Sequence, residues 1–282
     1  KAQSPLAACT KIMTDHETIE AEVVRENDDQ GENSASNTIV PAADILPTSL
    51  YLLPLSERPF FPAQALPLLL NEDPWLPTIE AAANREQRVI GLILVKPDSA
   101  EKASGPEDFH PVGTAARMHQ LTRNDGHLQF IAQGLKRFRI QNWLSSEPPY
   151  HVHVEYLSDE DDAGVEELRA YSLAVINTLK ELIPLNPLYS EELKFFLNRF
   201  NTHDPSPLAD FAASLTTATK DELQEILATA PVLERLKKVI VLIKKELEVA
   251  KLQAHIRKQV EEKMSEHQRK FFLREQLKAI QQ

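Results

Sequence analysis

His151 and His153 are the residues of this chain whose type and spacing could bind a metal ion. They alternate with Val152 and Val154, so a β-strand here would place both imidazoles on one face. A zinc site needs at least three protein ligands, and no third ligand follows at a suitable spacing. Polar side chains on the outer face of a half-buried strand explain the pair more simply, and we predict no metal site.

The few glycines argue against several kinds of chemistry. Among 282 residues there are seven glycines, and none belongs to a phosphate-binding P-loop, a dinucleotide-binding turn or a Gly-x-Ser-x-Gly motif. Cys9 is the single cysteine, which excludes an internal disulfide and a zinc knuckle. No nucleophilic residue and general base occur at a spacing that indicates a catalytic pair. We therefore expect neither catalysis nor a cofactor in this chain.

Apolar side chains are the better candidates for binding another molecule. Phe60 and Phe61 are adjacent among prolines, so we expect that both rings cannot face one core, and that a patch forms with Pro62 and Leu66. The alternative is that one ring is buried and the other is scattered surface.

A second candidate patch lies near the end of the chain. Met264 adapts to varied partners, and the adjacent Phe271 and Phe272 cannot both lie on one helical seam. The alternative is that these side chains pack on a following domain or on another copy of the chain.

Residues 231–282 set the architecture, because they contain no glycine and no proline after Pro231 and favour one helix. At about 1.5 Å per residue this helix would span roughly 75–80 Å, which exceeds a small domain. In its first half the apolar residues recur at alternating steps of four and three residues, which is the pattern of a coiled-coil or helix-bundle seam. A second stripe repeats at eleven residues, which favours a straight rod. The seam comprises Leu236, Ile240, Ile243, Leu247, Ala250 and Ala254, and the stripe comprises Val249, Leu252, Ile256, Val260, Met264, His267 and Phe271. We expect the first half to dock on its own domain and the second to extend beyond it.

The rest of the chain predicts three more regions. Residues 1–45 are acidic and poor in large apolar groups, which predicts a disordered leader, and residues 1–12 could precede a natural start at Met13. Residues 46–157 predict a small, partly closed β-barrel with one helix. Residues 158–230 predict a helical bundle. The fold class is thus α+β, with a β-barrel domain followed by an all-helical domain that ends in one very long helix.

Within the barrel region we expect strands at 50–55, 89–95, 112–123, 128–133, 138–143 and 150–157, with a hairpin turn at Asp125-Gly126. Prolines from Pro54 to Pro67 should interrupt any regular ladder there. Asp73 and Pro74 predict the start of a helix that runs to Glu86. Further helices are expected at 165–183, 190–200, 208–215 and 221–229, with the first stopped by Pro184.

Charge is unevenly distributed along the chain. Residues 158–230 carry 14 acidic and 5 basic side chains, whereas residues 231–282 carry 13 basic and 7 acidic ones. The two regions could form ion pairs within the chain or between copies. No apolar run reaches the ~18–20 residues of a membrane span, so we expect a cytoplasmic protein with no membrane contact.

Three stretches together resemble the N-terminal region of the ATP-dependent Lon protease. Residues 53–70 are similar to the opening strand of that family, and residues 112–140 share its Gly-Thr, Asp-Gly and Gly-x-x-Arg-x-x-Ile pattern. The last stretch resembles the long helix of the family. Its matching residues are Glu234, Arg235, Leu236, Ile256, Met264, Gln268, Arg269, Leu273, Gln276, Leu277, Lys278, Ala279, Ile280 and Gln281.

The resemblance implies a PUA-like barrel and a parent enzyme that is a hexameric AAA+ serine protease with a Ser-Lys dyad, using ATP and Mg²⁺. Neither the ATPase nor the peptidase motifs occur in these 282 residues. The implied role is capture of unfolded or damaged proteins through exposed apolar patches. Two alternatives stay open: an RNA-binding PUA-like module, which a net charge of −2 over residues 46–157 makes unlikely, and a coiled-coil oligomerisation scaffold.

Overall fold

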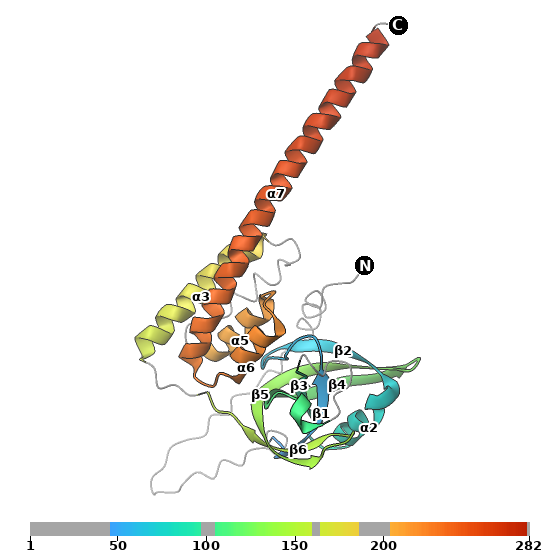
Figure 1. Ribbon diagram of the computed structural model, residues 1–282, viewed down its shortest axis with the longest axis vertical. Helices are drawn as coiled ribbons and strands as arrows, with labels where there is room; N and C mark the ends of the chain where they lie inside the picture. Colours follow the sequence, from blue (N-terminus) through green and yellow to red (C-terminus); the bar gives the residue numbers. More distant parts are fainter. Residues whose placement is uncertain (1–45, 97–104, 160–163, 186–203, 281–282) are drawn as a thin grey trace, which may run out of the picture. The chain divides into compact units, whose positions relative to one another are not determined.

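The computed structural model describes residues 46–96, 105–159, 164–185 and 204–280. These residues form two compact units that divide between Ser158 and Asp159. The first unit is a β-sheet with one longer helix, and the second is helical and includes one very long helix (Figure 1). The predicted α+β class is confirmed. The predicted leader at 1–45 and the predicted helix at 190–200 lie outside the described residues.

Six strands build the first unit: β1 (Ser49–Leu55), β2 (Ala65–Asn71), β3 (Val89–Leu94), β4 (Val112–Asn124), β5 (His127–Ser145) and β6 (His151–Tyr156). The strand order is β2-β5-β4-β3-β1-β6, and β6 also pairs with β5. Five strands therefore close into a barrel, with β2 added outside the ring on β5. Only β1 and β3 run parallel; the other pairings are antiparallel.

Strand β5 corrects one expectation, because the strands predicted at 128–133 and 138–143 are a single strand of 19 residues. Leu135 is an extra residue opposite β4, since Ala115 pairs with Lys136 and Ala116 pairs with Gly134. Such a bulge bends a strand without ending it. This bend lets β5 pair with β2 near its start and with β6 near its end. The predicted turn is present, with positive φ at Asp125 and Gly126.

Strand β2 corrects a second expectation, because the proline-rich segment ends in a regular ladder of seven residue pairs with β5. Gly134 donates to the carbonyl of Gln64, and Glu72 donates to the carbonyl of Gly126. The backbone N–H and C=O groups of the even-numbered β2 residues therefore point toward β5. The backbone of Pro67 points the other way, toward the free edge of the sheet. A proline has no backbone N–H to donate, but on the free edge of the sheet no strand needs that donor, so Pro67 does not weaken the ladder with β5.

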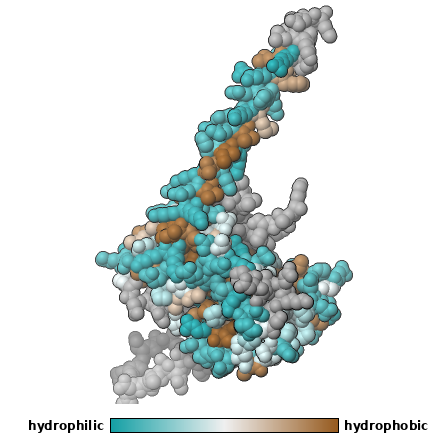
Figure 2. All heavy atoms as spheres, in the orientation of Figure 1, coloured by the Kyte–Doolittle hydropathy of each residue, from teal (hydrophilic) through white to brown (hydrophobic). Residues whose placement is uncertain are grey.

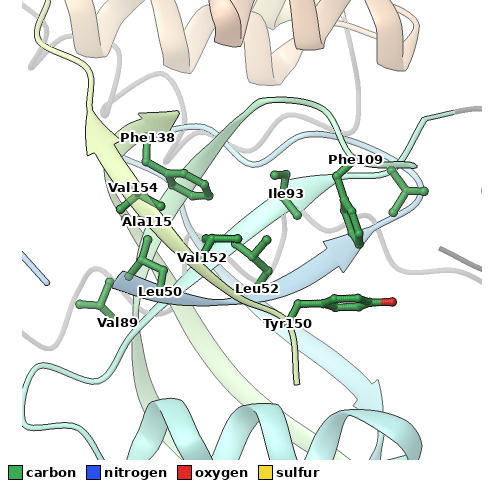
Figure 3. Close-up of a cluster of buried hydrophobic side chains, with 11 residues drawn as sticks. Leu50, Leu52, Val89, Ile93, Phe109, Ala115, Phe138, Tyr150, Val152 and Val154 are labelled. Carbon is green, nitrogen blue, oxygen red and sulfur yellow. The ribbon is translucent and has the colours of Figure 1, made fainter. Parts of the chain in front are cut away.

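Helix α2 (Glu72–Ala83) follows β2 directly. The backbone of Asp73 is extended (φ −87°, ψ 129°), so regular helix begins at the predicted Pro74 but ends three residues before the predicted Glu86. Ile79 and Ala82 of α2 pack into one apolar cluster with Leu53, Leu92 and Phe130. A second cluster fills the barrel and includes Leu50, Leu52, Phe138, Val152 and Val154 (Figure 3).

The second unit contains α3 (Val165–Leu185), α5 (Pro205–Leu215), α6 (Lys220–Ala228) and α7 (Val232–Ile280). Helix α3 includes Pro184, so this proline does not stop the helix as predicted. Helix α7 is continuous over 49 residues, or about 73 Å. The predicted seam faces the other helices: Leu236, Ile240, Ile243, Leu247 and Ala250 are buried. Beyond Ala254 every α7 side chain that is described is exposed.

Candidate functional site

The first candidate patch is not an exposed surface. Phe60 is 4% exposed and Phe61 is 1% exposed, so the expectation of an exposed patch here, and the alternative that one of the two rings lies at the surface, are both wrong. Phe60 packs in the cluster beneath α2, and its carbonyl accepts a hydrogen bond from Thr114 Oγ1. Phe61 is held by its backbone N–H, which donates to Gln64 Oε1 at 2.8 Å.

A glycine explains how the segment around Phe61 can approach the barrel. A Cβ placed on Gly134 would lie 2.5 Å from the carbonyl oxygen of Phe61, closer than real Cβ atoms come. The backbone at Phe61 thus lies directly against β5. Pro62 and Leu66 are only half-buried, and Leu66 packs against the cluster that holds Phe60.

The second candidate patch is exposed. Met264, Phe271 and Phe272 are 58%, 68% and 63% exposed on the distal part of α7. Met264 and Phe271 belong to the predicted stripe, and Phe272 lies beside it. The other apolar members of the stripe are also exposed: Val249, Leu252, Ile256 and Val260. In Figure 2 this stripe is visible as hydrophobic side chains that follow the helix. We call the exposed apolar residues from Val249 to Leu273 the distal stripe.

The distal stripe has the chemistry of a weak, adaptable binding surface. Its side chains are aliphatic, thioether and aromatic, and the surface of one helix offers no enclosed pocket that would select one partner. Seven basic and three acidic residues lie among residues 249–274. Lys270 and Glu266 form an ion pair there at 3.8 Å. The surface is therefore apolar with a basic border.

A buried arginine fixes the base of α7. Arg235 is fully buried, and its Nη1 lies 3.2 Å from Asp210 Oδ1 of α5. Its Nη2 pairs with Asp159, the residue at which the second unit begins, and also contacts the carbonyl of Ala230. Three segments of the unit thus meet at one guanidinium. Sequence reasoning missed this hub, although Arg235 lies beside the apolar seam, which was the available signal.

The predicted attraction between the acidic and basic regions is present within the second unit. Lys238 pairs with Glu225 at 2.7 Å, and Lys251 of α7 pairs with Glu181 of α3 at 3.2 Å. Lys237 lies 3.5 Å from Glu167. These groups are exposed or partly exposed, so each pair stabilises the docked half of α7 only modestly.

The two histidines share one face of β6, as predicted, and both are half-buried. His151 stacks on Tyr51 and lies beside Arg85, whose guanidinium the sequence did not suggest as a partner. Burial and the Arg85 charge both lower the pKa of His151. Within the described ranges, no three His, Cys, Asp or Glu side chains cluster closely enough to hold a metal ion.

A short basic run on β5, from Lys136 to Arg139, bears on the RNA-binding alternative, and it is incomplete at the surface. Lys136 and Arg139 are exposed, but Arg137 between them is buried. In the part of the chain that the structure describes, no helix is both long and apolar enough to cross a bilayer.

Comparison with known proteins gives a consistent result. The profile of the substrate-binding domain of ATP-dependent protease La (LON) matches residues 49–245. Lon protease 2 of Hydrogenovibrio crunogenus is 47% identical over 266 residues, covering 94% of this chain and 30% of that protein. Lon protease of Magnetococcus marinus is 38% identical, covering 95% of this chain and 34% of that protein. The chain thus spans about a third of the length of these relatives.

A solved structure has a similar fold. The N-terminal domain of the Lon protease of the Mycobacterium avium complex superposes with a TM-score of 0.57 at 23% identity. The match covers 70% of this chain and 98% of that structure.

Proposed function

Since this chain belongs to the family of LON substrate-binding domains, we propose that it is the substrate-recognition and assembly region of an ATP-dependent Lon-like serine protease. In this proposal it captures unfolded or damaged proteins, and the peptidase and ATPase chemistry belongs to other parts of the parent. The parent would use ATP and Mg²⁺ and a Ser-Lys dyad. Because ATP is available inside the cell, we place the parent in the cytoplasm.

The observation that supports this proposal is the exposure of the distal stripe on α7. Unfolded proteins differ from folded ones in presenting apolar side chains to water, and the distal stripe can bury such side chains without requiring a particular sequence. One stripe binds weakly, but several copies in a hexamer would raise the effective concentration of a client. Phe60 and Phe61 are too buried to take part without unfolding of the barrel.

The test uses the full-length protease with Phe271→Ser and Phe272→Ser together. We expect slower degradation of an unfolded protein, with a higher KM, and unchanged cleavage of a short peptide that needs no capture. Val241→Ser is the matched control, because Val241 is also an exposed apolar residue of α7 but lies outside the distal stripe. Unchanged degradation of the unfolded protein by the double variant would refute the role of these phenylalanines.

A second candidate function uses the same surface. The distal stripe could pack against several other copies of α7 in one assembly, which would make this region a coiled-coil oligomerisation scaffold. Sedimentation of the isolated chain separates the two functions. We expect a monomer or dimer, whereas a stable hexamer without the ATPase would favour the scaffold.

A further inference from the structure

One arginine holds the end of α2 to the barrel. Arg85 lies two residues after the last residue of α2, and its Nη1 donates to the carbonyl of Ser49 on β1 at 2.6 Å. Its Cζ lies 4.7 Å from the centre of the Tyr51 ring. Its Nη2 lies 3.1 Å from His151 Nε2 on β6. A single side chain thus joins α2 to two neighbouring strands.

The chemistry of the guanidinium determines the protonation state of His151 in this arrangement. A guanidinium has donors only and stays charged, so His151 Nε2 must accept the hydrogen bond. The imidazole is then neutral, with its hydrogen on Nδ1. The Tyr51 ring stacks on the imidazole at 4.5 Å and 18°.

Among the residues that the structure describes, no carboxylate forms an ion pair with Arg85. The polar and titratable groups beside His151 are Ser49 and Tyr51 on β1, Ser145 on β5, His153 on β6 and Arg85 after α2. None of these five is a carboxylate, and in the described part of the chain the charge that shifts the pKa of His151 is that of Arg85. A proton on Nε2 would therefore remove an acceptor and place two cations in contact.

We propose that Arg85 and His151 form a proton-sensitive latch between the end of α2 and strands β1 and β6. At neutral pH the latch is closed by the Arg85-to-His151 hydrogen bond. Acid opens it by protonating His151, and the segment after α2 detaches from the barrel. This inference goes beyond the proposed function and does not depend on it.

The direction of the pH effect follows from linkage. The pKa of His151 is lower in the folded chain than its ordinary value of 6.5, so the unfolded chain binds the proton more readily. The stabilisation is complete above pH 6.5 and is lost progressively as the pH falls toward the folded pKa.

The experiment follows the histidine nitrogens and the backbone amides of the chain by NMR between pH 7.5 and 5. At neutral pH we expect His151 Nε2 to be unprotonated. Arg85→Met should raise the pKa of His151 toward its ordinary value. Acid should reduce the exchange protection of the Asn84 amide, which bonds to Glu80 at the end of α2.

Two variants make the result decisive. His151→Gln keeps an acceptor for Arg85 but cannot titrate, so the loss of protection at Asn84 in acid should vanish. His153→Gln is the matched control on the same face of β6 and should behave as the unaltered chain. A hydrogen on Nε2 at neutral pH, or loss of Asn84 protection that persists in His151→Gln, would overturn the latch.

Discussion

At the scale of single residues, Arg235 shows how a charge can be essential to a fold without contributing much net stability. Burying an ion pair removes both groups from water, and the attraction between them roughly offsets that loss. Removing only one partner is different, because the remaining charge stays buried. Because Arg235 is buried among three segments, substitutions of its carboxylate partners should destabilise the second unit.

We expect Asp210→Ala to lower the free energy of unfolding by about 3 kcal/mol, because the fully buried Arg235 then keeps only the half-exposed Asp159 as a charged partner. The double variant Arg235→Met with Asp210→Leu should recover much of this loss. Urea unfolding measures both. A change of less than about 0.5 kcal/mol in Asp210→Ala would contradict the role of the hub.

At the scale of elements, short helices depend on how their ends are completed. Helix α6 has nine residues and begins with a capping box. The Glu222 N–H donates to Thr219 Oγ1, and the Thr219 N–H donates to the Glu222 carboxylate at 2.9 Å. The Thr219 hydroxyl also donates to this carboxylate, and the two hydrogen bonds that the carboxylate accepts from Thr219 lower the pKa of Glu222. The cap is consequently sensitive both to mutation and to acid.

We expect Thr219→Ala to destabilise the second unit by about 1 kcal/mol, while Thr219→Ser, which keeps the hydroxyl, stays close to the unaltered chain.

Because the pKa of Glu222 is lower in the folded chain, the contribution of Glu222 to stability is present above the ordinary pKa of 4.5 and disappears as the pH falls through the folded pKa. Thermal unfolding at pH 7 and pH 3.5 should show a smaller acid loss in Glu222→Gln. Equal losses in both chains would exclude this contribution.

At the scale of the whole molecule, α7 passes from a packed environment to an exposed one without a break. Its first half packs against α3, α5 and α6, whereas its second half has only local helix interactions in the described structure. Most helix stability in proteins comes from tertiary packing, so the two halves should differ in stability although they share one helix.

Hydrogen exchange of the isolated chain should therefore show strong protection over residues 232–250 and weak protection over residues 256–274. Measurement at two concentrations supplies the control, since pairing between copies would protect the distal half only at the higher one. Uniform protection along α7 at low concentration would contradict an uncovered distal stripe.

Much of this architecture follows from local patterns. The uninterrupted helix formers of residues 232–280 need no partner to indicate a helix, and the change from the seam to the distal stripe correctly separates the buried half of α7 from the exposed half. The Asp125-Gly126 turn and the alternation of His151 and His153 are also local, because turns and strand faces depend on neighbouring residues.

Other features depend on residues that are distant in the chain. Phe60 and Phe61 are both buried because Gly134, more than seventy residues away, lets the backbone approach β5. Pro67 is accepted in β2 because that strand joins the sheet on one side only. Arg85 reaches His151, and Arg235 reaches Asp159, only after strands and helices have packed. The sequence by itself determined the long helix α7 with its exposed stripe and the turn between β4 and β5. Tertiary structure alone decided which charges meet and which aromatic rings are hidden, because burial and pairing are properties of segments brought together from far apart.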